Sequence, residues 1–207
     1  MARLDSVADL RRIIAEPRTA TRSKILEALD EQSIEFLKRC PFALIGTTTE
    51  DGTIEVSPKG DEPGFIRVED PKTLLIPERV GNNLAFGLSN IIATGKIGLL
   101  ALVPATGETL RLSGTAEVFD DPELVQSLSS LGKPALLATR VHIKHCYFHC
   151  ARSVLRANLW KPEAWPAPGR ISFGKIIAPR VDAGQDFADK IDASVAGSYK
   201  DRLWSNG

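Results

Sequence analysis

The sequence predicts a mainly β fold with flanking helices, an α+β chain centred on a six-stranded antiparallel barrel. One observation is that short β-rich segments alternate with turn signals between residues 42 and 148, as in Phe42–Thr49, Glu50-Asp51-Gly52 and Thr53–Ser57. Another is that apolar residues outside this stretch recur at spacings of three and four, the period of a helix. About six antiparallel strands around one core favour a barrel over an open sheet, because closure removes exposed strand edges.

The chain divides into three predicted parts: a helical extension over 1–40, a barrel over 41–165, and a tail over 166–207 that packs on the barrel or on a partner. Within the extension, apolar spacing predicts helices over Leu4–Ile14, from Thr21 or Ser23 through Leu29, and around Ile34–Leu37. A further helix over Asn82–Ala93, ending near Gly95, interrupts the run of strands.

Composition narrows the class of protein. The 207 residues carry 26 Lys and Arg against 26 Asp and Glu, so the formal net charge is zero and we expect no nucleic-acid partner. No apolar run reaches the roughly 18–20 residues that span a bilayer, and the charged start Met1–Arg12 lacks the apolar core of a secretory signal. Three cysteines do not make a disulfide framework. We therefore expect a cytoplasmic protein with reduced thiols and no membrane contact.

The segment Ser57-Pro58-Lys59-Gly60-Asp61 is the first candidate binding element, placed where we expect a strand to end. Lysine supplies charge to a phosphate, serine adds a hydrogen bond, and glycine lets backbone N–H groups approach an anion. A solvated turn is the simpler interpretation of this segment taken alone.

The segment Pro77-Glu78-Arg79-Val80-Gly81-Asn82-Asn83 is the second candidate, between a strand end and a helix start. Helix N-termini bind anions readily, because they offer unpaired N–H groups and a positive dipole end. Arg79 can fork onto phosphate oxygens, while Asn82 or Asn83 can cap the helix or hold a ligand. Helix capping alone explains the asparagines but leaves Arg79 without a role.

Two later segments carry further polar side chains. Alternation along Thr109–Gly114 places Arg111 on the face opposite Leu110 and Leu112, as a surface charge or as a group that reaches a ligand or a neighbouring subunit. The segment His142–Cys150 holds all three histidines, which invites a zinc interpretation. The spacing of these residues does not provide four ligands for a tetrahedral zinc ion, and no second Cys/His pair elsewhere in the sequence completes the site. We therefore predict no metal site.

Taken together, these segments resemble the pyridoxamine 5'-phosphate oxidase-related, FMN-binding split-barrel family. The resemblance rests on SPKGD at Ser57–Asp61, PxRxGN at Pro77–Asn82, ETLR at Glu108–Arg111, and YFHC at Tyr147–Cys150 followed by Leu159-Trp160. Their order and spacing are similar to the family's over Phe42–Trp165. Asn82-Asn83 stands where the enzymes that oxidise pyridoxamine phosphate carry a basic pair, which argues against that particular reaction.

The resemblance implies a homodimer with FMN bound at the interface by both subunits. One subunit would supply Val56, Ser57, Pro58 and Lys59, then Ile76 and Pro77, and finally Arg79, Asn82 and Asn83 for the phosphate and ribityl chain. Arg111 would come from the partner, and the remaining wall would comprise His149, Arg152, Arg156 and Trp160.

Three functional hypotheses follow. The first is an FMN-dependent oxidoreductase that acts on an unidentified small-molecule substrate or electron donor. The second is a non-enzymatic binder or sensor of flavin, haem or deazaflavin, since the histidines of His142–His149 are suitable axial ligands for haem. The third is an interaction protein that has lost its ligand, against which the cations Lys59, Arg79 and Arg111 argue.

Overall fold

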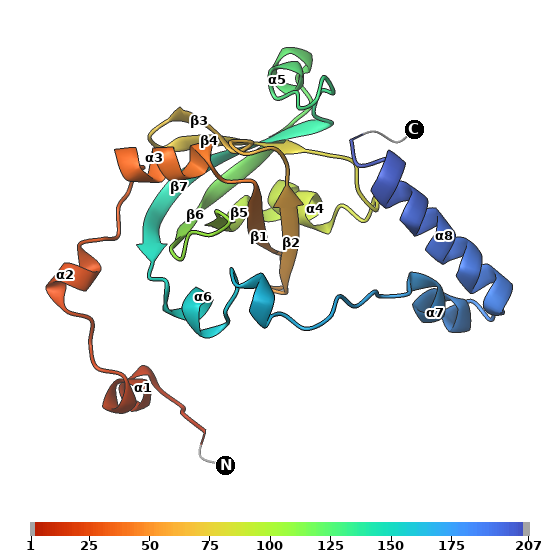
Figure 1. Cartoon of the computed structure of the whole chain (residues 1–207). Coiled ribbons are helices and arrows are strands. Elements are labelled where there is room, and N and C mark those ends of the chain that lie inside the picture. The colour runs from red at the N-terminus through yellow and green to blue at the C-terminus, as the bar shows by residue number, and fades with distance from the viewer. Residues whose placement is uncertain (1–2, 205–207) are drawn as a thin grey trace.

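The centre of the molecule is one antiparallel sheet that curls into a barrel (Figure 1). The computed structural model describes residues 3–204. In these residues the spatial order of the strands is β2-β1-β5-β6-β7-β4-β3. The strands are β1 (Phe42–Thr48), β2 (Ile54–Gly60), β3 (Arg67–Asp70), β4 (Thr73–Glu78), β5 (Lys96–Leu102), β6 (Thr109–Phe119) and β7 (Leu137–His149).

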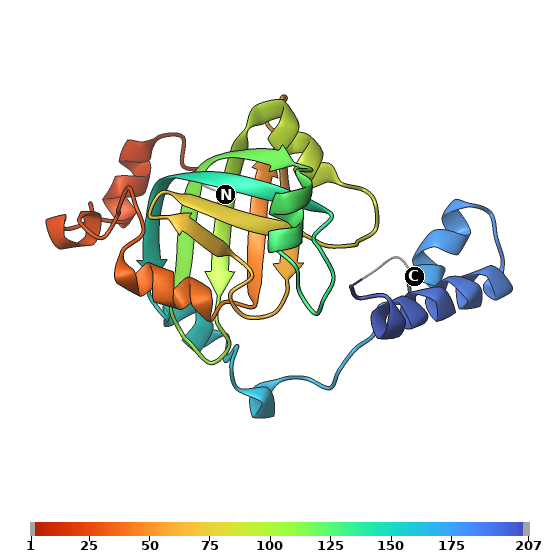
Figure 2. The same ribbon diagram turned by 90° about the horizontal axis from the view of Figure 1, so that it is seen from above.

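Helices flank this sheet (Figures 1 and 2). Three of the described α-helices precede β1 in the sequence, and three follow β7. The α-helices are α1 (Val7–Ile13), α2 (Thr19–Arg22), α3 (Glu31–Lys38), α4 (Phe86–Thr94), α5 (Pro122–Ser127), α6 (Arg152–Arg156), α7 (Phe173–Ile177) and α8 (Gln185–Asp201). The short 3₁₀ turns are η1 (Pro162–Ala164) and η2 (Ala178–Arg180). The predicted fold class is confirmed, with seven strands in the described residues rather than the six expected.

The core lies inside the curl of the sheet, where alternate residues of each strand point inward. Ala43 on β1, Leu74 on β4 and Leu110 on β6 are fully buried there. Helix α3 adds Phe36 and Leu37 to the same core, and the Asp30 side chain caps that helix by accepting a hydrogen bond from the Ser33 amide. A sheet covered on its inner face by one continuous apolar cluster provides a rigid frame for a site at its rim.

The prediction of a helix from Thr21 or Ser23 through Leu29 is wrong. The helix α2 ends at Arg22, and Leu26 instead pairs with Cys146 of β7 through two backbone hydrogen bonds of 2.9 and 2.8 Å. Strand β4 covers β7 only as far as His142, so the backbone beyond it is free to pair with the N-terminal segment. An unpaired strand edge therefore overrides the helical spacing of the apolar residues.

The C-terminal helices α7 and α8 form a hairpin that stands away from the barrel (Figure 2). Gly174 packs against the backbone of Ala188 so closely that a Cβ atom there would lie 2.0 Å from the Ala188 carbonyl oxygen. The carboxylate of Asp192 accepts hydrogen bonds from the Gly174 amide at 2.9 Å and the Ser172 hydroxyl at 2.5 Å. These hydrogen bonds hold the pKa of Asp192 below its usual value.

Within residues 3–204, no helix combines the length and the apolar character needed to cross a bilayer.

Candidate functional site

A cavity of about 590 Å³ opens where β2, the end of β4 and the start of α4 meet, within the size range of small-molecule and cofactor sites. Both segments singled out in the sequence line it. Its wall includes Val56, Ser57, Pro58, Lys59, Pro77, Arg79, Asn82 and Asn83. The fold thus brings eight of the predicted cofactor residues to one place.

Strand β2 carries its polar side chains inward and its apolar ones outward. Ser57 and Lys59 are half-buried, whereas Ile54 and Val56 are 74% and 61% exposed. The segment Ser57–Gly60, which was expected at a strand end, forms the last four residues of β2 and pairs with β1 from Ser57–Ile45 to Gly60–Phe42. The period of two along a strand therefore directs Ser57 and Lys59 to the same side, toward the cavity.

Two ion pairs join the strand β2 region to β4 across the split in the barrel. In the described residues no backbone ladder joins these strands, which lie toward opposite ends of the sheet. The ammonium of Lys59 contacts the carboxylate of Glu78, whose side chain is buried and lies 3.5 Å from the Thr139 hydroxyl. The charge of Lys59 is thus offset within the same chain.

The second pair is more deeply buried. Arg79 donates from Nε to Asp61 Oδ2 at 2.6 Å and from Nη2 to the Leu128 carbonyl at 2.7 Å. Its side chain is 12% exposed and that of Asp61 is 1% exposed. The remaining nitrogen, Nη1, is buried and has no hydrogen-bond partner within residues 3–204. Arg79 is therefore fixed by two partners and keeps one unsatisfied donor, which is costly unless a ligand or water accepts from it.

The loop that leads from β4 to α4 has an unusual backbone. Asn83 and Ala85 adopt φ values of 62° and 52°, in the left-handed region that residues other than glycine rarely occupy. Asn82 Oδ1 accepts from the Leu84 amide at 3.0 Å, and no backbone–backbone hydrogen bond of the described chain involves residues 80–83. Strained loops of this kind cluster at ligand sites.

Helix α4 begins at the cavity without a side-chain cap. Its N-cap residue is Ala85, which has no acceptor to offer, and the first turn, Phe86–Leu88, lines the cavity wall. The sequence predicts that this helix starts at Asn82, with Asn82 or Asn83 either capping it or holding a ligand. The helix instead starts at Phe86, after the left-handed residues Asn83 and Ala85, so neither asparagine is its N-cap. The uncapped N–H groups can donate hydrogen bonds to an anion in the place of a side-chain oxygen.

The other predicted site residues lie elsewhere in the chain. Ile76 is buried in the barrel interior beside Ser57 and Lys59. Arg111 is exposed on the outer face of β6, opposite the buried Leu110 and Leu112, as predicted. Five other predicted site residues do not line the cavity, namely Arg111, His149, Arg152, Arg156 and Trp160. Trp160 donates instead from Nε1 to the Thr106 carbonyl at 2.8 Å.

Sequence reasoning did not identify the two carboxylates of the site. Asp61 and Glu78 stand inside the two motifs, but each is paired with a cation of the other motif, 18 or 19 residues away. No local pattern signals such a pairing, because it depends on how the sheet curls. A charge in a binding motif can be a counter-ion as well as a ligand contact.

A curled antiparallel sheet with a polar, partly strained cavity at its split defines a split barrel. Residues 29–150, more than half of the chain, match the family described as pyridoxamine 5'-phosphate oxidase. The chain belongs to that family. No curated protein matches it.

Several solved structures have similar folds. HupZ from Group A Streptococcus shares 17% identity, with 58% of this chain and 93% of that chain covered and a TM-score of 0.46. A Clostridium acetobutylicum protein related to general stress protein 26, of the pyridoxinephosphate oxidase family, shares 17%, with 59% and 91% covered and a TM-score of 0.44. An FMN-binding protein from Syntrophomonas wolfei shares 10%, with 55% and 86% covered and a TM-score of 0.42.

Proposed function

We propose that the protein binds FMN in the cavity between β2, β4 and α4 and acts as an FMN-dependent oxidoreductase of its family. The observation that carries this proposal is the uncapped start of α4, which opens on a cavity of about 590 Å³ beside an arginine with an unpaired nitrogen. A phosphate group supplies acceptors for both sets of donors. The family assignment makes a flavin the ligand to test first.

The residues present fit such a group. Arg79, Asn82 and Asn83, with the first turn of α4, would hold the phosphate and ribityl chain. Residues 56–59 of β2 would line one side of the ring system, and Ile76-Pro77 of β4 the other. When bound, FMN supplies hydride or electron transfer, and the protein's own side chains orient it and set the polarity around it.

A second copy of the chain would complete the site. The edge strand β2 exposes Ile54 and Val56, and the nearby α4 segment exposes Leu84, Phe86 and Ile92. Exposed apolar residues on an edge strand favour association. In the homodimer, the partner would supply Arg111, His149, Arg152, Arg156 and Trp160, which lie outside the cavity of their own subunit.

Absorption spectroscopy tests the ligand directly. Protein purified or reconstituted with FMN should show a flavin absorption band at about 450 nm. In analytical ultracentrifugation it should sediment as a dimer. A Soret band would instead support haem, and a band that appears only with deazaflavin would support that cofactor. A colourless protein that resists reconstitution with all three would refute the proposal. Reduction of the bound flavin by one nicotinamide and not another would identify the electron donor.

Replacing Arg79 tests the phosphate role. Arg79→Gln should weaken FMN binding by about tenfold or more, the usual worth of a charge-assisted hydrogen bond, and should leave riboflavin binding nearly unchanged. The comparison of FMN with riboflavin isolates the phosphate from any general loosening of the site. Equal losses for both ligands would show that Arg79 acts only by supporting the fold.

A further inference from the structure

A second group of basic side chains lies on the outer face of the barrel, outside the cavity. The basic residues Lys24, Arg111 and His149 surround Tyr147, and we call these four residues the cationic patch. Lys24 comes from the N-terminal segment, Arg111 from β6, and the two aromatic residues from β7. No hypothesis drawn from the sequence gave the N-terminal segment a role in binding.

Backbone pairing places Lys24 in this patch. The two hydrogen bonds between Leu26 and Cys146 fix the N-terminal segment alongside β7. Two residues earlier, the Lys24 ammonium donates to the Phe148 carbonyl at 3.1 Å and lies 5.3 Å from the centre of the Tyr147 ring. Its position is therefore set by the fold and not only by a flexible side chain.

Arg111 and His149 converge on the same tyrosine. The Arg111 guanidinium carbon lies 5.9 Å from the Tyr147 ring centre, and Nη1 is 3.3 Å from the Tyr147 hydroxyl oxygen. The imidazole of His149 lies 5.0 Å from that ring, centre to centre. Three basic groups thus surround one phenol, whose faces attract cations.

The patch lacks the counter-ions that other cations of this protein possess. Lys59, Arg79 and Arg140 each contact a carboxylate, whereas within residues 3–204 no carboxylate lies within ion-pair distance of Lys24 or Arg111. Burial, and then the positive charges of Arg111 and Lys24, hold the pKa of His149 below its usual value. An anion bound among these groups would relieve that repulsion.

We infer that the cationic patch is a phosphate-binding site of the protein. A phosphate group offers several acceptor oxygens to Lys24, Arg111, the Tyr147 hydroxyl and His149, which together offer the donors. The phosphate belongs either to the cofactor held by a second copy or to a phosphorylated substrate. The first of these two sources rests on the proposed function, which already assigns Arg111 and His149 to the FMN site of a second copy. Binding of inorganic phosphate to flavin-free protein tests the patch independently of that function.

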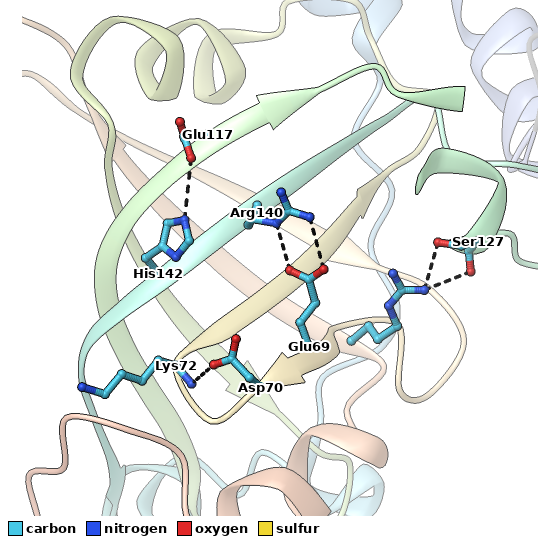
Figure 3. Close-up of polar contacts among 8 residues, drawn as sticks. Glu69, Asp70, Lys72, Glu117, Ser127, Arg140 and His142 are labelled. Atoms are coloured by element: carbon cyan, nitrogen blue, oxygen red, sulfur yellow. Dashed lines mark hydrogen bonds and ion pairs between the residues drawn. The ribbon is translucent and has the colours of Figure 1, made fainter. Parts of the chain in front are cut away.

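The first experiment titrates flavin-free protein with inorganic phosphate and follows the imidazole signals of His149 by NMR. Phosphate should raise the pKa of His149 with saturation at millimolar concentration, and sodium chloride at the same ionic strength should not reproduce the change. Lys24→Met should abolish the response, and Lys24→Gln provides a second variant. Lys72→Met, which removes an exposed lysine elsewhere on the barrel (Figure 3), should leave it intact.

The second experiment distinguishes the two sources of phosphate. If the cofactor of a second copy occupies the patch, Lys24→Met should weaken FMN binding by about tenfold and riboflavin binding hardly at all, and loading with FMN should abolish the response to phosphate. If a substrate occupies it, FMN affinity should not change, and loaded protein should still bind phosphate. A wild-type protein without a phosphate-specific response, or Lys24 variants with an undiminished one, would overturn the inference.

Discussion

Removing one partner of the buried pair between Asp61 and Arg79 should destabilise the barrel, because the other charge is then left buried without a counter-ion. Asp61→Asn removes the negative charge and leaves the Arg79 guanidinium buried, with its Nη1 already unpaired. Breaking a buried pair by removing one partner costs about 3–5 kcal/mol. Because asparagine still offers an oxygen to Arg79 Nε, we expect a loss of about 2–3 kcal/mol in the free energy of unfolding.

A more exposed arginine–carboxylate pair serves as the control. On the outer face, Arg140 donates from Nε and Nη2 to the two carboxylate oxygens of Glu69, at 2.9 and 3.2 Å (Figure 3). Both side chains are 29% exposed, so water screens this pair far more than the pair in the split. Glu69→Gln should therefore reduce the free energy of unfolding by less than about 1 kcal/mol.

Urea denaturation of flavin-free protein, followed by far-ultraviolet circular dichroism, measures both losses. The slope of the free energy of unfolding against urea should be the same in all three proteins, so that a shifted midpoint reports stability. Equal losses of unfolding free energy in the two variants would refute the reasoning, because burial would then have no influence on the cost of breaking an ion pair. A stabilised Asp61→Asn protein would refute it more directly.

Two further predictions concern other parts of the chain. At pH 8 a thiol-alkylating reagent should label Cys150 in the native protein and spare Cys40 and Cys146, because burial raises the pKa of both buried thiols; mass spectrometry after digestion identifies the labelled site. Asp192→Ala should loosen the α7–α8 hairpin by removing the acceptor for the Gly174 amide, which limited proteolysis would detect as faster cleavage after residue 165; an unchanged rate would contradict this role.

The β region could be predicted because its signals are local. The turn Glu50-Asp51-Gly52 and the alternation that follows it mark the β1–β2 hairpin whatever its surroundings, and the structure confirms that hairpin. The N-terminal segment could not be predicted in the same way. The spacing of Ile25, Leu26 and Leu29 is helical, but a free edge of β7, more than 100 residues away, takes Leu26 as a pairing partner.

The candidate site shows the same division between local and distant causes. The types and order of residues identified which segments would line a cavity, and both β2 and the loop after β4 do so. The sequence could not show that Lys59 and Arg79 face carboxylates, because these pairs form only when the two ends of the sheet approach each other. The net charge does not indicate such pairing either, since a cation contributes one positive charge whether or not a carboxylate lies beside it.

The way the split is bridged explains why a cavity exists at all. Strands joined by a backbone ladder lie about 4.8 Å apart, which leaves no room for a ligand between them. Between β2 and β4 the connections are side-chain ion pairs, Lys59 with Glu78 and Asp61 with Arg79, and long side chains keep the two strands further apart than a ladder would. The barrel is thereby held together while its wall stays open. Ion pairs at this place satisfy two requirements that a closed ladder cannot satisfy together, namely stability of the barrel and space for a ligand.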